Sequence, residues 1–189
     1  PGPFQYNSVL RTFREAGKWA EALELLNEMR NSGKSFPNEQ CFNTVLQVCD
    51  RAKKPQEADD LLQMMKNTDN VEPNVFSYNA VMRAHERVGD VHKVLELFKE
   101  MEENNIEADW HSYICYISAC KRGGLWRKSV EKLEKMREMG MYPGVKAYVM
   151  SMKICILAKK WPLSVEIGEK FLDDLEGKNL YRDNSGNKI

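Results

Sequence analysis

A short phrase recurs along the chain at a fixed interval, and this interval limits the fold more than any other feature of the sequence. The phrase is an aromatic residue, Asn, a small residue and two apolar residues, and it begins at Tyr6, Phe42 and Tyr78, in steps of 36 residues. Fainter copies begin at Tyr113 and Tyr148, each after a further 35 residues. A period of this length is typical of stacked supersecondary units. We therefore expect a repeat solenoid, a class of fold that offers extended binding surfaces.

Each unit of the repeat is predicted to contain two helices joined by a short turn. In the first unit, the apolar residues between Tyr6 and Phe13 follow helical spacing. Gly17 then interrupts this helix, and a second apolar set runs from Trp19 to Met29. The later units keep the same plan, so the whole chain is expected to be helical.

Composition argues against several classes of protein. The 189 residues carry 28 cations and 28 anions, and this zero net charge is unusual for a simple nucleic-acid binder. The five cysteines form no CxxC pair, so a disulfide framework or a zinc site is not expected. No apolar run is long enough to span a membrane. The chain contains no Gly-rich phosphate loop, HExxH or Gly-x-Ser-x-Gly motif. We therefore expect no catalytic residues, no metal and no cofactor.

The repeat resembles that of pentatricopeptide repeat proteins. The third unit carries the resemblance most clearly, with Val75-Phe76-Ser77-Tyr78-Asn79-Ala80-Val81-Met82, then Val88-Gly89, then Leu95-Glu96-Leu97-Phe98-Lys99-Glu100-Met101, and finally Ala108-Asp109. The resemblance implies an all-α fold, a right-handed superhelical solenoid of stacked helix–turn–helix repeats. The expected units are 3–38, 39–74, 75–109, 110–144 and 145–183, followed by a polar tail at 184–189.

The resemblance implies that the chain binds single-stranded RNA, with about one base for each repeat. In the family, the Asn of the phrase and the last residue of the unit contact the base edge. The family's code assigns cytosine to Asn/Asn pairs and uracil to Asn/Asp, so the implied core is CCU. The alternative is that these residues cap helices, where Asn is also favoured. The pairs in this chain are Asn7 with Asn38, Asn43 with Asn74, and Asn79 with Asp109.

The code does not extend to the last two units. Ile114 and Gly144 occupy the fourth pair, and Val149 occupies the fifth. Neither Ile nor Val can form a hydrogen bond with a base. These units are expected to stack on RNA, contact its backbone, act as a cap or bind protein.

Stacking and phosphate contacts are also implied by the resemblance. The residue two places before the aromatic one should stack on a base, which selects Phe4, Phe76 and His111, although Phe at these positions could instead pack on a neighbouring unit. A cation near the end of the first helix should contact phosphate. The residues in that register are Arg51, Arg87 and Arg122.

Charge is distributed unevenly over the predicted helices. The five twelve-residue windows that begin at Phe4, Gln40, Phe76, His111 and Lys146 cover the first helices, and they contain nine cations and three anions. The first helices therefore carry an excess of six positive charges, which the rest of the chain cancels. A neutral chain can in this way present a basic groove to a polyanion.

Two functions remain open at this point. The first is RNA binding in organellar RNA processing, splicing, stability or translation, in a mitochondrion or plastid. Three bases would bind weakly, so a homodimer, a longer parent protein or a larger ribonucleoprotein would be needed. The second is a structural subunit of a large organellar protein complex that docks mainly on protein.

Overall fold

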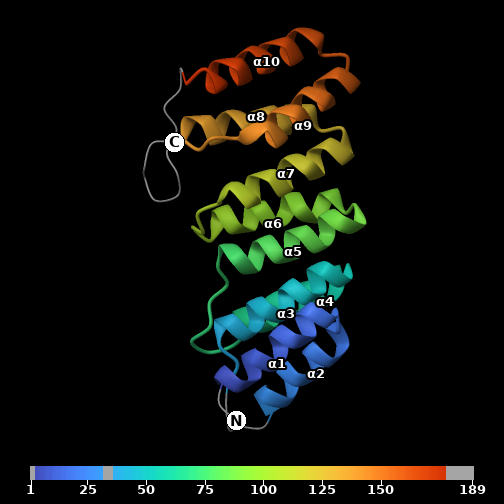
Figure 1. Cartoon of the computed structure of the whole chain (residues 1–189), viewed down its shortest axis with the longest axis vertical. Helices are drawn as coiled ribbons and strands as arrows, with labels where there is room; N and C mark the ends of the chain where they lie inside the picture. The colour runs from blue at the N-terminus through green and yellow to red at the C-terminus, as the bar shows by residue number, and fades with distance from the viewer. Residues whose placement is uncertain (1–2, 32–35, 178–189) are drawn as a thin grey trace. The chain divides into compact units, whose positions relative to one another are not determined.

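The computed structural model describes residues 3–31 and 36–177, and within these ranges it contains ten α-helices and no strand (Figure 1). The all-α prediction is therefore confirmed. The predicted polar tail at 184–189 and the last residues of the fifth unit lie outside the described residues. The helices are α1 (Pro3–Ala16), α2 (Trp19–Asn31), α3 (Glu39–Ala52), α4 (Pro55–Lys66), α5 (Val75–Val88), α6 (Val91–Glu103), α7 (Trp110–Gly123), α8 (Trp126–Glu138), α9 (Gly144–Leu157) and α10 (Trp161–Leu175).

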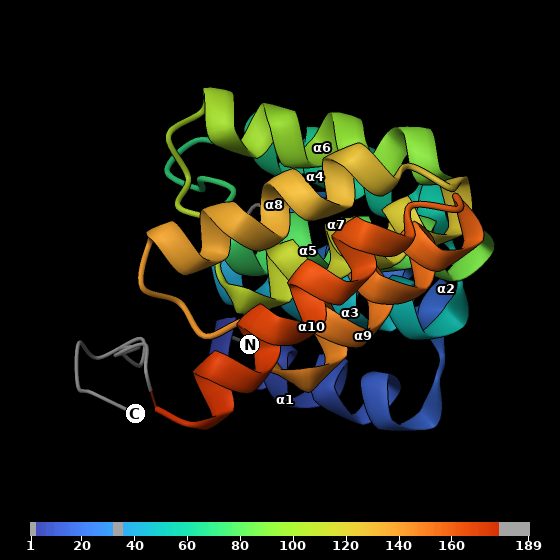
Figure 2. The same ribbon diagram turned by 90° about the horizontal axis from the view of Figure 1, so that it is seen from above.

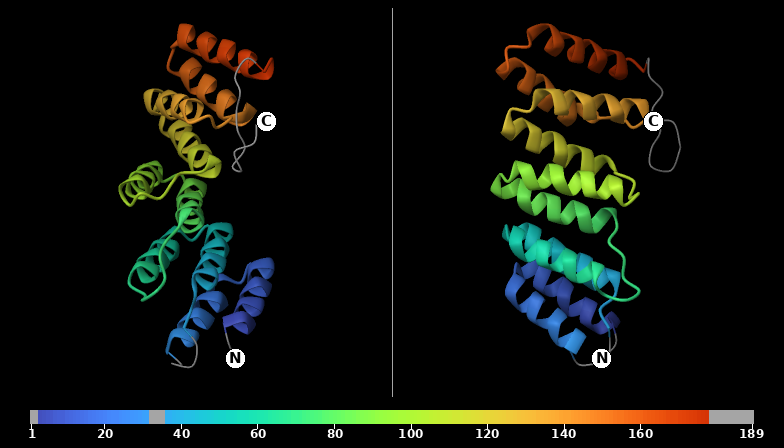
Figure 3. Two further views of the ribbon diagram at one scale, coloured as in Figure 1. Left: turned by 90° about the vertical axis from the view of Figure 1, so that its left-hand side faces the viewer. Right: turned by 180° about the vertical axis from the view of Figure 1, so that it is seen from behind.

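The chain divides into two compact units, Pro1–Glu107 with α1 to α6 and Ala108–Ile189 with α7 to α10. Within the first unit, the odd-numbered helices α1, α3 and α5 pack side by side, and α2 and α4 each pack on the next odd-numbered helix (Figure 3). In the second unit, α7 packs on α9, α8 also packs on α9, and α10 lies beside α9 (Figure 2). The odd-numbered helices, called the first helices below, thus form a continuous layer within each unit.

The first helices begin and end at residues suited to their termini. Asn38, Asn74 and Asp109 are the N-caps of α3, α5 and α7, and each accepts a hydrogen bond from a backbone N–H of the first turn. At the other end, Gly89 adopts a left-handed conformation with φ of 85°, and Lys53 adopts the same conformation with φ of 56°. The turn geometry is thus kept even where the repeat has lost its Gly.

The aromatic residue of the repeated phrase joins the two helices of its own hairpin. The side chains of Phe42, Tyr78, Tyr113 and Tyr148 are at most 1% exposed. The Tyr78 hydroxyl donates to Glu100 on α6 at 2.9 Å, and the Tyr148 hydroxyl donates to Asp174 on α10. Burial and the hydrogen bond to Glu100 raise the pKa of Tyr78 to about 12, so this phenol remains a donor at neutral pH. The third and fifth hairpins therefore share one packing motif.

None of the described helices is long and apolar enough to cross a bilayer. All five cysteines are buried free thiols. Burial raises the pKa of Cys49 and Cys120 to about 12, so both remain protonated and behave as small core residues.

A buried histidine connects three helices of the first unit. His85 on α5 is 5% exposed; its Nε2 lies 3.0 Å from Asp59 Oδ2 on α4, and its Nδ1 lies 3.1 Å from Asp90 Oδ2 at the start of α6. Burial opposes the charged form, but the hydrogen bonds and charges of the two carboxylates outweigh it and raise the pKa of His85. The imidazolium therefore favours the packing of α4, α5 and α6.

We predict that His85→Gln destabilises the chain more at about pH 5.5 than at about pH 8.5. A raised pKa means that the stabilisation is fully present below the unfolded pKa, roughly 6.5, and is lost as pH rises through the folded value. Urea unfolding followed by circular dichroism at both pH values measures the difference. His92→Gln is the control, because the His92 side chain is 93% exposed. A His85→Gln effect that does not change with pH would contradict the ion-paired histidine.

Candidate nucleic-acid interface

The first helices of the first unit line an open cavity of about 430 Å³, and two of the predicted RNA contacts lie in its wall. Asn43 and Phe76 both line it, although they belong to different repeats. The volume falls within the range of small-ligand sites, roughly 300–1,000 Å³. Arg11 and Arg14 are two of the first-helix cations of the predicted basic groove, whereas Gln47 had no predicted role. The lining residues are Arg11, Arg14, Glu39, Gln40, Asn43, Thr44, Gln47 and Phe76.

The structure brings together the second predicted base-reading pair through a carboxylate. Glu39 Oε1 accepts a hydrogen bond from Asn43 Nδ2 at 3.5 Å and another from Asn74 Nδ2. Asn43 Oδ1 is buried and has no hydrogen-bond partner among the described residues. A buried acceptor without a partner costs about 1–3 kcal/mol. An amide held at this cost beside a cavity is a sign of a ligand-binding role.

The other two pairs are arranged differently. Asn7 is 5% exposed and donates from Nδ2 to Gln40 Oε1 at 2.9 Å, while its Oδ1 is a second buried acceptor with no partner in the described part of the chain. Its predicted partner Asn38 accepts from the Cys41 N–H at 3.0 Å. Asn79 is 4% exposed on α5 of the first unit, whereas Asp109 belongs to the second unit.

The last residue of each predicted pair is a helix cap. Asn38, Asn74 and Asp109 all use a side-chain oxygen for capping, so the capping alternative is confirmed for these three residues. Capping does not use the amide nitrogen, and Asn74 shows this by donating from Nδ2 to Glu39 while its Oδ1 caps α5. Base reading by the six paired residues stays a prediction.

The predicted stacking residues are all exposed. Phe4 and Phe76 are 83% and 63% exposed, and Phe76 also lines the cavity. His111 is exposed and contacts the Trp110 ring edge-on, with 5.2 Å between the ring centroids. An exposed aromatic face is what base stacking requires, and stacking stays a prediction for these residues.

The predicted phosphate contacts have carboxylate neighbours in the first unit. Arg51 Nη1 lies 3.6 Å from Glu15 Oε2, and Arg87 Nε donates to Asp50 Oδ1 at 2.6 Å. Arg122 is exposed near the end of α7. The position of each arginine within its repeat does not reveal these carboxylates, because each carboxylate belongs to the preceding repeat.

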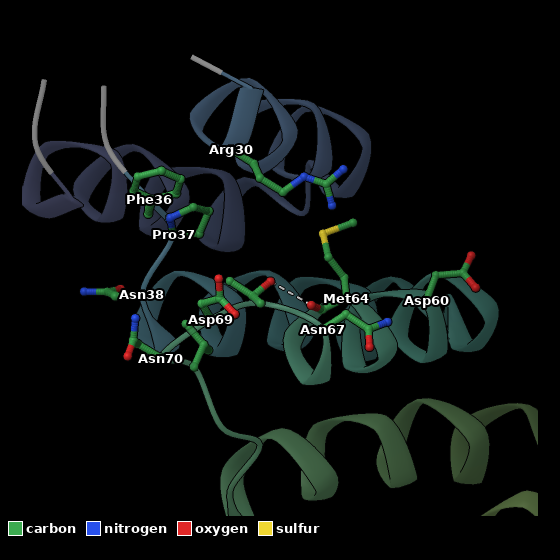
Figure 4. A pocket seen from close by; sticks show the side chains of 11 residues that line it. Arg30, Phe36, Pro37, Asn38, Asp60, Met64, Asn67, Asp69 and Asn70 are labelled. Atoms are coloured by element: carbon green, nitrogen blue, oxygen red, sulfur yellow. Dashed lines mark hydrogen bonds between the residues drawn. The ribbon is translucent and has the colours of Figure 1, made fainter. Parts of the chain in front are cut away.

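A second, larger cavity of about 810 Å³ lies between the ends of α2 and α4 (Figure 4). Its wall carries one cation, Arg30, which points toward Met64, and two carboxylates, Asp60 and Asp69. Two carboxylates against one cation disfavour the entry of a polyanion. The cavity on the first helices has two arginines against one carboxylate, so we place the candidate interface there.

The described residues contain no cluster of three or more His, Cys, Asp or Glu that could hold a metal ion. The groups that line the cavity are amides, guanidinium groups, one aromatic ring, one hydroxyl and the carboxylate of Glu39. These groups bind and orient a ligand, and they suit a planar polar ligand that carries negative charge.

Family models for this repeat match most of the chain. A model described as PPR repeat matches residues 6–33 and 111–141, a pentatricopeptide repeat domain matches 37–88, and a PPR repeat family matches 73–122. The chain belongs to the pentatricopeptide repeat family. No curated protein matches it in sequence.

Solved pentatricopeptide repeat structures share the fold. The PPR domain of Arabidopsis thaliana protein-only RNase P 1, in complex with tRNA, is 22% identical, with a TM-score of 0.79 over 92% of this chain and 90% of that one. Maize PPR10 is 19% identical, with a TM-score of 0.72 over 94% of this chain. A. thaliana nuclear proteinaceous RNase P 2 is 15% identical, with a TM-score of 0.77 over 89% of this chain. The chain spans only 24% of PPR10 and 38% of RNase P 2.

We predict different stability effects for the two members of the Asn43–Asn74 pair. Asn74→Ala removes the capping box of α5 and should lower the free energy of unfolding by about 1 kcal/mol. Asn43→Ala removes an unpartnered acceptor, which favours the variant, but also the long hydrogen bond to Glu39 and the packing of the side chain, which opposes it, so the free energy of unfolding should not fall by more than about 0.5 kcal/mol. Urea denaturation measures both. A large loss in Asn43→Ala would show that Asn43 is a structural residue.

Proposed function

We propose that this pentatricopeptide repeat chain binds single-stranded RNA along the first helices of its first unit. The observation that carries the proposal is the cavity in which Asn43, Phe76, Arg11 and Arg14 converge from three helices. These residues supply an amide for a base edge, a ring for a base face and, in Arg11, a cation for a phosphate. Arg14 would have to leave its contacts with Glu15 and Gln47 to reach a second phosphate. Proteins commonly recognise single-stranded nucleic acid by stacking an aromatic ring on a base while a polar side chain contacts the edge of the base.

RNA would bind by replacing weak contacts that the free protein makes at these residues. The Asn43–Glu39 hydrogen bond is long at 3.5 Å, so the Asn43 amide can exchange it for a base edge. A base stacked on Phe76 would cover a ring that is 63% exposed in the free protein. The nearby guanidinium groups would then offset the charge of the adjoining phosphates.

Two relatives support RNA as the ligand class. The PPR domain of RNase P 1 is in complex with tRNA, and another structure of PPR10 is in complex with an 18-nucleotide psaJ RNA element. That PPR10 structure is 23% identical, with a TM-score of 0.71 over 97% of this chain. From these relatives we take only the class of ligand, which is RNA.

The finer proposal is a preference for pyrimidines with a CCU-like core. If each of three bases contributes about 2 kcal/mol, the total of about 6 kcal/mol corresponds to a dissociation constant of roughly tens of micromolar. Such binding needs a homodimer or a larger ribonucleoprotein to be retained on one site. We propose a role in mitochondrial or plastid RNA metabolism, which rests on family membership.

A structural role is the second candidate function, and one observation on α10 favours it. Trp161, Val165, Leu172 and Leu175 lie on one face of α10, and each is 57–61% exposed. The exposed acidic residue Glu169 lies beside this face. Since α9 packs on α8 within the same unit, a helix like α9 but with basic flanks is the partner that this face would accept.

We predict that the chain binds a CCU-containing RNA oligomer more tightly than a purine oligomer. The variant Asn43→Ala combined with Asn79→Ala should weaken CCU binding by about tenfold, since two amide contacts are lost. The log–log salt slope of the parent should be about −2, from roughly three phosphates. Fluorescence anisotropy across a salt series measures all three quantities.

The control is Asn31→Ala, which removes an exposed amide at the end of α2. It should bind both oligomers as the parent does. Absence of binding at high micromolar protein, or binding that ignores sequence and the Asn43 and Asn79 substitutions, would reject the RNA reader and favour the structural role.

A further inference from the structure

Asp50 holds two arginines of the next repeat in a fixed arrangement. It lies near the end of α3 and is 4% exposed. Its Oδ2 accepts from Arg83 Nε at 3.0 Å, and its Oδ1 accepts from Arg87 Nε at 2.6 Å. Both carboxylate oxygens are thus used, one for each guanidinium. Arg83 and Arg87 are one helical turn apart on α5, so their side chains lie on the same face of that helix.

The arrangement leaves the outer nitrogens of both guanidinium groups available. The two contacts with Asp50 are made through Nε, and within the described residues neither arginine has an Nη contact with another acceptor. The side chains of Arg83 and Arg87 are 39% and 43% exposed. Paired Nη groups of a held guanidinium match the oxygens of a phosphate in a bidentate way.

Arg51 provides the contrast within the same layer of helices. Its Nη1 already points to Glu15 Oε2 at 3.6 Å and to the Arg14 carbonyl at 3.5 Å. Glu15 is an exposed carboxylate, and its side chain is 64% exposed. Arg51 presents the same fork only after its Nη1 gives up these long contacts. Identical positions in the repeat therefore offer different phosphate sites.

We propose that Arg83 and Arg87 form a clamp for one RNA phosphodiester and that Asp50 is its positioning residue. The proposal rests on the RNA-binding function proposed above and adds two residues, Arg83 and Asp50, to the predicted contacts. Asp50 limits the rotation of both side chains, so less conformational entropy is lost when the phosphate binds. The pair of arginines keeps one positive charge in excess after Asp50 is counted.

In an alternative explanation, Asp50 competes with the phosphate for the two arginines. In that account the carboxylate merely neutralises the arginines, and its removal strengthens RNA binding. The positioning account predicts the reverse, because an Asn side chain keeps only one oxygen acceptor for two Nε donors. The sign of the change in affinity therefore separates the two accounts.

The test measures binding of the CCU-containing oligomer to the full chain by fluorescence anisotropy across a salt series. Asp50→Asn should weaken binding by about tenfold even though it removes a negative charge. The control is Asp60→Asn, which makes the same charge change at an exposed position on α4 and should bind as the parent or slightly more tightly. Binding by Asp50→Asn that equals or exceeds that of Asp60→Asn overturns the positioning role.

Arg83→Gln tests the clamp without removing the buried carboxylate. Its partly exposed side chain can be replaced with little effect on folding, which thermal unfolding checks. Binding should weaken, and the salt slope should become shallower by at most about 0.7, the value for complete loss of one phosphate contact on a single strand, because Arg87 still faces the same phosphate. An unchanged slope and affinity overturns the clamp while the parent's RNA binding stands. A parent chain that binds neither oligomer overturns the proposed function, and the clamp with it.

Discussion

The buried aromatic residue that opens the second to fifth copies of the repeated phrase is the contact on which the candidate site depends. Tyr78, for example, is fully buried and donates to Glu100 on the second helix of its own hairpin. Successive residues on a helix are about 100° apart. Fixing the tyrosine inside the hairpin therefore turns the next residue, Asn79, away from the second helix and toward a neighbouring first helix. The same constraint acts on Asn43 after Phe42, and it places an amide in the cavity wall.

Carboxylates between hairpins explain how a chain with zero net charge can offer a basic surface. Asp59 and Asp90 hold His85 on one face of α5, while Asp50 holds two arginines on another. These anions are engaged within the protein, and Asp50 is almost entirely buried. Arg83 and Arg87, whose guanidinium groups contact Asp50, stay partly exposed. A count of formal charges treats both signs alike, so it hides the difference in exposure that a polyanion would meet.

The repeat predicted the helices well because each helix follows from the local spacing of apolar residues. The ten helices of the described residues confirm this prediction. The capping roles of Asn38, Asn74 and Asp109 also follow from residue type, and they were foreseen as an alternative to base reading. Arg11 and Arg14 were predicted only as part of a basic groove, and the side-chain contacts that complete the cavity were not predicted. Arg14 and Gln47 come from adjacent repeats and are joined by a 3.2 Å hydrogen bond, which no motif within one repeat describes. Side-chain reach between repeats, and not helical propensity, decides these contacts.

These contacts between repeats nevertheless follow a rule that the sequence contains. Asp50 contacts residues 33 and 37 positions later, and the Asn7–Gln40 and Arg14–Gln47 hydrogen bonds also span 33 positions. A residue 36 positions later occupies the equivalent place in the next unit, so separations of 33 and 37 select the two residues, one turn apart, that flank it. The period of the repeat together with the four-residue turn of a helix thus specifies which side chains meet. Polar residues 33 and 37 positions apart are therefore the signal by which Asp50, Arg83 and Arg87 could have been found from the sequence.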